Sequence, residues 1–185
     1  MFQFSSGNIT LLGSHDALPA IYAGYRTHAK LVEEFNLASS EGQVSFLAVG
    51  CSGEWPFLVI AQRYSPSAGQ GFYPGALHIP DTGMLFVGAG ERLLCYDLNE
   101  VHRIWEDKAD TGFWSWSHHE NVVLMSAELE LAAWDTHGHK LWTTFVEPPW
   151  SFKVVDGRVQ LKVMDVVSSF DLCSGPTTAA PSDFG

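Results

Sequence analysis

The chain is short of basic residues relative to acidic ones. Its 185 residues include 10 Lys and Arg against 21 Asp and Glu, which gives a net charge of −11 with histidine neutral. A surface of that sign repels phosphate backbones, so we do not expect a nucleic-acid partner. An acidic surface favours solubility and would also complement a basic protein partner.

Cysteine and long apolar runs are also scarce. Three cysteines, Cys51, Cys95 and Cys173, form neither a C-x-x-C pair nor an even set for disulfides. No run reaches the roughly 18 apolar residues of a membrane-spanning helix, and the N-terminal residues lack the basic start and small-residue cleavage site of a secretion signal. We therefore expect a cytoplasmic protein without a membrane partner.

The motifs of common catalytic sites are missing. The sequence contains no G-x-S-x-G elbow, no H-E-x-x-H pair and no phosphate-binding loop. Its one glycine-dense stretch, FVGAGER at 86–92, lacks the third glycine of a dinucleotide fingerprint. The sequence thus predicts a protein that is not an enzyme and that uses no cofactor and no metal.

What the chain does contain is apolar and aromatic surface. Hydrophobic residues make up 46% of it, with seven Trp and twelve Phe, which is enough for one well-packed domain. We predict a single domain over 1–173. Residues 174–185 are small and proline-containing, which is typical of a flexible tail.

One stretch has the spacing of an amphipathic helix. Its apolar and aromatic positions recur at steps of four, three, four and three: Ile21, Tyr25, His28, Val32 and Phe35. This period lines one helix face and predicts a helix near 17–38, with Asp16 as a candidate N-cap.

Two strand-length apolar runs follow this helix. Residues 43–50 (QVSFLAVG) and 55–64 (WPFLVIAQRY) are separated by a turn-rich CSGE, which predicts a hairpin. The unique N-terminal part, 1–64, would then comprise an initial strand, the helix and this hairpin. A loop rich in Gly, Pro and Ser separates it from the rest.

The rest, 76–172, is repeated. Residues 83–97, 121–135 and 157–171 superpose without gaps at offsets of 38 and 36, and each copy ends in an aromatic residue followed by Asp. The copies share further anchors downstream: Ile104-Trp105 with Leu141-Trp142, and Trp114-Ser-Trp116 with Trp150-Ser-Phe152.

The middle copy, AAWDTHGHKLW, resembles the repeat of pyrroloquinoline-quinone-type (quinoprotein) β-propellers. The resemblance covers about two and a half blade units. The first copy has Glu100 and Val101 in place of the turn glycine, and the last stops after its aromatic-Asp pair. The resemblance implies that each Asp accepts hydrogen bonds from turn amides and that each Trp packs between neighbouring sheets.

Closed propellers need at least four blades, so these repeats cannot close a ring by themselves. We therefore predict a mainly β fold of antiparallel, blade-like repeats in an open, incomplete stack, with one N-terminal amphipathic helix as its cap. The alternative is a homodimer in which two chains associate edge to edge. The quinone cofactor and calcium of the family's full rings are not expected in so short an array.

Four aromatic residues are the main candidate binding residues. Trp114, Trp116, Trp150 and Phe152 occupy matching positions of successive units, and alternation along a strand would place each pair on one face. They pack between sheets in one interpretation and form a recognition surface in the other.

Carboxylates and histidines are weaker candidates. Glu128 and Glu130, two residues apart, are expected to share one strand face, where they are solvated or lie beside a ligand. Two groups of histidines fall at turns and are interpreted as solvated residues and not as metal ligands: His137 with His139, and His118 with His119.

The hypothesis that follows is a non-enzymatic protein-binding module with aromatic and acidic surface. Its sharper form is an immunity-like protein that neutralises a basic partner. The alternative is a small-molecule or carbohydrate binder, or a weak hydrolase, with Trp faces as stacking platforms beside Glu128 or Glu130. A concave aromatic pocket would favour the ligand, and a flat exposed patch would favour the protein.

Overall fold

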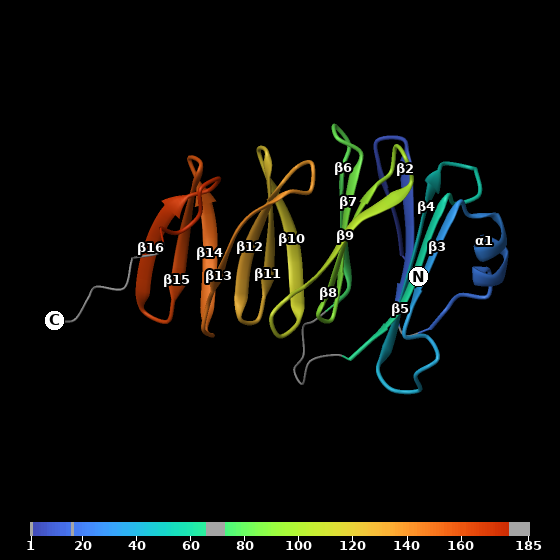
Figure 1. Cartoon of the computed structure of the whole chain (residues 1–185), viewed down its shortest axis with the longest axis horizontal. Coiled ribbons are helices and arrows are strands. Elements are labelled where there is room, and N and C mark those ends of the chain that lie inside the picture. Colours follow the sequence, from blue (N-terminus) through green and yellow to red (C-terminus); the bar gives the residue numbers. More distant parts are fainter. Residues whose placement is uncertain (1, 16, 66–72, 178–185) are drawn as a thin grey trace.

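Four β-sheets lie side by side in one row, and a single helix covers one end of the row (Figure 1). The structure is a computed structural model and describes residues 2–15, 17–65 and 73–177. The row does not close on itself among these residues, so the predicted open, mainly β stack is confirmed. Asp16, residues 66–72 of the predicted loop and residues 178–185 of the predicted tail lie outside the described residues.

The first sheet is built from the unique N-terminal part. Its strand order is β1-β2-β4-β5-β3, and β3 runs parallel to β5 while the other pairs are antiparallel. The strands are β1 (Phe2–Ser6), β2 (Ile9–His15), β3 (Leu31–Phe35), β4 (Gln43–Cys51) and β5 (Leu58–Tyr64). The antiparallel pair β4–β5 confirms the predicted hairpin.

The helix is much shorter than its spacing predicts. Only α1 (Tyr22–His28) is helical, and Leu31–Phe35 forms the edge strand β3. The prediction of a helix over 17–38 is therefore wrong in its second half, and Ile21 stands at the N-cap. The amide of Leu31 donates to the carbonyl of Phe57 (3.0 Å), so pairing with a distant strand overrides the local helical period.

The helix covers a sheet face and not a sheet edge. Tyr22 and Tyr25 pack their rings against Phe46 on the outer face of the first sheet, with centroids 5.8 and 6.3 Å away. The alternate residues of β4, Leu47 and Val49, point the other way and join the core shared with the second sheet. One face of the sheet thus belongs to the helix and the other to the stack.

The three repeat units form the remaining sheets. The second sheet holds β6 (Gly75–Ile79), β7 (Met84–Ala89), β8 (Arg92–Asp97) and β9 (His102–Lys108); the third holds β10 (Phe113–His119), β11 (Val122–Ala127), β12 (Glu130–Asp135) and β13 (Lys140–Phe145). The fourth holds β14 (Trp150–Val155), β15 (Arg158–Val163) and β16 (Val166–Asp171). The three gapless copies of the sequence are the hairpins β7–β8, β11–β12 and β15–β16.

The Asp that ends each repeat copy makes the expected hydrogen bonds with amides of the turn that follows it. One carboxylate oxygen of Asp135 accepts the amides of His137 and His139, both at 2.9 Å. Asp97 and Asp171 each bond two amides of their own turns in the same way. The implied Asp–amide turn is therefore present in all three copies.

Tryptophans of the outer strands fasten each repeat sheet to the next. The indole N–H of Trp105 in β9 donates to the carbonyl of Gly138 (2.6 Å), and that of Trp142 in β13 donates to the carbonyl of Leu172 (2.8 Å). At the start of the row the ammonium of Lys30 donates to Glu100 (3.0 Å), at the turn position equivalent to Gly138. Lys30, just before β3, thus donates to the backbone carbonyl of Glu100 as Trp105 donates to that of Gly138.

The fourth sheet presents a polar face at the end of the row. Met84, Phe86 and Cys95 of the second sheet are buried against the third sheet, and their equivalents in the third sheet are buried against the fourth. The equivalent residues of the fourth sheet are exposed and polar: Arg158, Gln160 and Ser169. This substitution pattern is that of a terminal repeat whose outer face meets water.

Candidate functional site

Three of the predicted aromatic residues form a row between the third and fourth sheets. The rings of Trp114 and Trp150 are stacked with centroids 5.2 Å apart, and Phe152 stacks on Trp150 at 6.2 Å. The indole N–H of Trp150 donates to the carbonyl of Glu128 (2.9 Å), which fixes the ring in place. Trp150 and Phe152 share one face as predicted, and all three rings are half-buried.

Trp116 lies apart from this row. The register of β10 against β11 shifts between Phe113 and Ser115, so a bulge interrupts the alternation at Trp114. Trp116 consequently packs toward the second sheet, against Phe86, Phe113 and Trp134, at centroid distances of 5.3 to 5.5 Å. The prediction that Trp114 and Trp116 share one face is wrong for this reason.

Glu128 and Glu130 do not share a strand face either. Glu128 lies in the turn before β12, whereas Glu130 begins that strand and is buried. The carboxylate of Glu130 accepts the amide of Asp110 (2.9 Å) and the hydroxyl of Thr143 (2.6 Å). It therefore ties the loop between the second and third sheets to β13.

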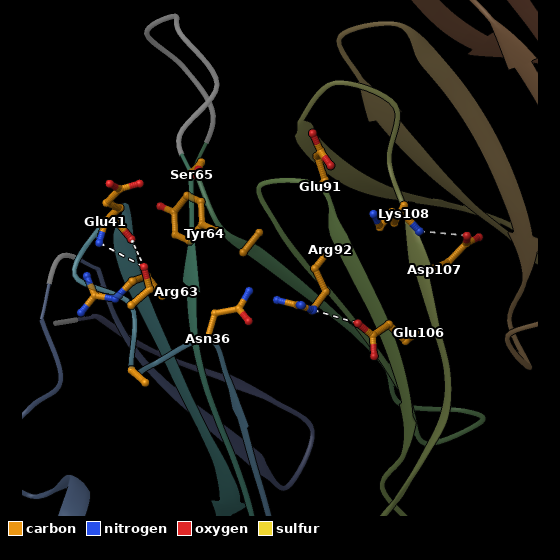
Figure 2. Close-up of a pocket in the computed structure, with 13 residues that line it drawn as sticks. Asn36, Glu41, Arg63, Tyr64, Ser65, Glu91, Arg92, Glu106, Asp107 and Lys108 are labelled. Atoms are coloured by element: carbon orange, nitrogen blue, oxygen red, sulfur yellow. Dashed lines mark hydrogen bonds and ion pairs between the residues drawn. The ribbon is translucent and has the colours of Figure 1, made fainter.

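Two adjoining hollows lie between successive sheets of the row. The first, of about 560 Å³, lies between the first and second sheets (Figure 2). The second, of about 500 Å³, lies between the second and third sheets. They share the lining residues Glu91 and Lys108 and therefore adjoin. Together the two hollows extend over three sheets and are named the acidic groove.

Carboxylates outnumber cations along the acidic groove. Three cations line it, Arg63, Arg92 and Lys108, against six carboxylates: Glu41, Glu91, Glu106, Asp107, Asp110 and Glu130. Two of the cations are already engaged, because Arg92 pairs with Glu106 (2.9 Å), as Figure 2 shows, and Arg63 donates to the carbonyl of Gly42 (3.0 Å).

Three of the six carboxylates have no cationic partner among the described residues, although Asp110 accepts a hydrogen bond from the hydroxyl of Thr111 (3.2 Å). Glu41, Glu91 and Asp110 are exposed, and within the described ranges none of them takes part in an ion pair. Asp107 differs, since the ammonium of Lys140 reaches it at 2.9 Å. Negative charge without a local counter-charge attracts cationic groups of a partner.

His137 and His139 take part in hydrogen bonds within their own turn. His139 donates to Asp135 through Nδ1 (2.9 Å). Burial alone would raise the pKa of Asp135, but hydrogen bonds from His139 and His137 outweigh it and hold that pKa below its usual range. Among the described residues, no group of three or more His, Cys, Asp or Glu side chains is arranged to hold a metal ion.

The acidic groove was not found by sequence reasoning. Its lining residues come from segments as far apart as 36–41 and 143–145, and its exposed carboxylates are not set apart from other charged residues in the sequence. One signal was available, because Glu91 and Asp110 fall at two of the turns that the repeat itself locates. In the described part of the chain, no helix has the length and apolar character needed to cross a membrane.

No protein-family model matches the sequence, and no curated protein sequence matches it. The structure is similar to the β-propeller domain of the Trilobed protease from Pyrococcus furiosus, with a TM-score of 0.51 and 9% identity over 87% of this chain and 47% of that one. The fold is β-propeller-like.

Two other propeller-like matches are weaker. Hsv2 of Kluyveromyces lactis gives a TM-score of 0.42 with 11% identity, over 70% of this chain and 42% of that one. BamB from Moraxella catarrhalis gives 0.41 with 10% identity, over 76% of this chain and 50% of that one. This propeller-like chain spans half or less of each protein, and the fold assignment rests on the Pyrococcus structure alone.

Proposed function

We propose that the chain is a non-enzymatic protein-binding module whose acidic groove receives a basic segment of a partner protein. The observation that carries this proposal is the set of three exposed carboxylates without an ion pair, Glu41, Glu91 and Asp110, along the acidic groove. Lysine or arginine side chains of an extended partner segment would pair with them at the rim. The finer form of the proposal is an immunity-like role, in which the groove neutralises a basic partner.

The position of the tryptophans supports a protein partner over a carbohydrate or other small ligand. Neither of the two hollows that make up the acidic groove has a Trp in its lining. Trp150 and Phe152 instead pack against the core between the third and fourth sheets. A stacking platform beside a carboxylate, which the ligand alternative requires, therefore has no counterpart in these hollows.

We also infer that the blades are of the quinoprotein type. The three Asp–amide turns and the indole hydrogen bonds of Trp105 and Trp142 support this inference. It concerns the blade unit and not the cofactor, because the described stack forms no central funnel of a full ring.

Binding of a lysine-rich peptide tests the groove. The groove variant replaces Glu41 and Glu91 with Gln and Asp110 with Asn. The control variant makes the same change of net charge elsewhere, at the exposed residues Glu54, Glu120 and Asp165. Three rim pairs of about 0.5 kcal/mol each predict roughly tenfold weaker binding for the groove variant by calorimetry.

The control variant should bind as the native chain does, and higher salt should weaken both complexes. Equal losses in the two variants would mean that the peptide senses only overall charge, which contradicts the proposal. A basic protein that copurifies with the native chain should likewise be lost from the groove variant and kept by the control variant.

A further inference from the structure

In the fourth sheet β16 is the edge strand, whereas the equivalent strands of the second and third sheets are inner strands. Its equivalents β8 and β12 each pair with a fourth strand, β9 and β13 respectively. Among the described residues the fourth sheet has only three strands, and β16 is its edge. The chain's own Gly175 bridges Asp171 at the end of β16, so the unpaired part of this edge is residues 166–170. An edge strand offers unpaired backbone N–H and C=O groups to any extended segment that comes alongside.

The side chains of β16 are those of a strand meant to be paired. The other strands on this side of the stack carry charges, such as Glu33 and Glu34 in β3 and Arg103 and Glu106 in β9, which discourage unwanted pairing. Residues 166–170 of β16 carry none. Val166 and Val167 are 71% and 66% exposed, although β-branched residues favour paired strands.

The space beside β16 already has a wall on one side. Trp142 of β13 packs edge-on against Phe170 of β16, with centroids 5.4 Å apart, and donates to the carbonyl of Leu172. In the second and third sheets the fourth strand, β9 or β13, packs against the outer strand of the sheet before it. A strand added along residues 166–170 would accordingly lie under β13, next to the buried Gly175 of the same chain, which already packs against Trp142.

The opposite side of the same space is cationic. Lys162 and Arg158 of β15 lie on the outer face of the fourth sheet, and neither forms an ion pair with a described residue. Arg158 already reaches across to β16, where its guanidinium donates to the carbonyl of Ser169 (3.1 Å). Side chains of this length can therefore pair with acidic groups on an added strand.

We propose that the β16 edge is a docking site for an extended segment of a partner protein, in which apolar residues alternate with acidic ones. The segment adds antiparallel to β16, as β9 adds to β8, with its apolar side chains under β13 and its carboxylates toward Lys162 and Arg158. This inference is independent of the acidic groove, which takes a segment of the opposite charge.

A second copy of the chain fits this site less well. In each copy the inner face of the fourth sheet is covered by the third sheet, because Val159, Leu161 and Phe170 pack against it. If two copies paired through β16, the third sheet of the second copy would therefore approach the first copy as well. The second copy's third sheet would then occupy the space that β13 covers. A single strand fits where a stacked sheet does not.

A labelled peptide of sequence VEIEVEV is the probe, and VKIKVKV, with the same apolar residues and the opposite charge, is its matched control. Fluorescence anisotropy on the full chain measures affinity, and amide hydrogen exchange locates the complex. The acidic peptide should bind more tightly, and binding should slow exchange in Val166–Asp171. The proposal fails if the basic peptide binds equally well.

Two variants weaken the site without touching the core. Lys162→Glu removes a cation beside the β16 edge, and Lys153→Glu makes the same change on β14, at the far edge of the sheet. Val166→Asn with Val167→Asn removes the exposed apolar surface, and Val155→Asn is its control on β14. We expect about tenfold weaker binding for each edge variant and little change for each control.

The free protein provides a further check. Amides of β16 that are already protected in a dilute monomer would show that a segment of the same chain fills the edge, which would overturn the proposal. Protection that rises with protein concentration would show that a second copy fills it, with the same consequence. The triple groove variant should leave binding of the acidic peptide unchanged, so the two proposals can fail separately.

Discussion

Single residues in the turns determine how closely successive sheets approach. Gly175 adopts a positive φ of 74°, and a Cβ placed there would overlap the indole of Trp142. Gly157 has a similar φ of 69°, but a Cβ there would meet no atom within 4 Å. The pair separates two demands on glycine, one from the backbone and one from a neighbouring side chain.

Gly157→Ala should therefore cost about 1 kcal/mol of unfolding free energy, which is the backbone penalty alone. Gly175→Ala should cost about 2 kcal/mol more, since the indole must move as well. Urea denaturation of both variants measures the difference. Equal losses would mean that the Trp142 contact relaxes freely.

Asp135 should contribute to acid stability. Its pKa is lower in the folded chain than in the unfolded chain, so its contribution is complete above the unfolded value of about 3.9 and is lost as the pH falls through the folded value. The difference in unfolding free energy between the native chain and Asp135→Asn should shrink as the pH drops from 6 to below about 3. A difference that is constant over this range would contradict the assignment.

Secondary-structure elements were predictable where the information is local. The hairpin β4–β5 and the three repeat hairpins follow from alternation and turn residues, and the turn aspartates behave as their spacing indicates. β3 was missed because its helical spacing is contradicted only by its parallel partner β5, 27 residues further along the chain (Leu31 with Leu58). Trp116 was misplaced because a bulge leaves no mark in the sequence.

Glu130 shows how one side chain can join elements. Because its carboxylate serves both Asp110 and Thr143, Glu130→Gln should weaken two hydrogen bonds at once and lower stability by about 1–2 kcal/mol. Glu128→Gln is the matched control and should change stability little, because its contact with Trp150 uses the backbone carbonyl. Thermal unfolding of the two variants measures both effects.

Trp142 tests the fastening between the third and fourth sheets. Trp142→Phe keeps most of the apolar contact with Phe170 but leaves the carbonyl of Leu172 without its indole donor, at a cost of about 1–3 kcal/mol. Hydrogen exchange should then rise in β14–β16 more than in β1–β5. A uniform rise along the chain would show that the row unfolds as one unit.

At the scale of the whole molecule, stability comes from three interfaces between sheets and not from one central core. Separate buried clusters lie between the first and second, second and third, and third and fourth sheets. The polar outer face of the fourth sheet ends this series. The sequence contained this information, since the first two of the three aligned copies have apolar residues where the last has Arg158, Gln160 and Ser169. Its meaning depends on knowing which face each residue occupies.

Restoring the apolar pattern should make the molecule associate with itself. Replacing Arg158 with Val, Gln160 with Leu and Ser169 with Ala gives the fourth sheet the outward residues that the third sheet buries, Val122, Leu124 and Ala133. The variant should form higher oligomers in light-scattering chromatography, while Lys153→Leu alone should not. A monomeric variant would show that these three positions do not control the end of the row.

The two finished ends give the molecule a direction. The helix α1 covers one terminal face, and lysine and arginine side chains are exposed on the other. Neither face therefore resembles the apolar surfaces that the sheets bury between them. Because the two end faces differ from the buried surfaces, identical units do not add to the row end to end. What remains open to other molecules is the flank, where loops and strand edges from all four sheets are displayed in a fixed order.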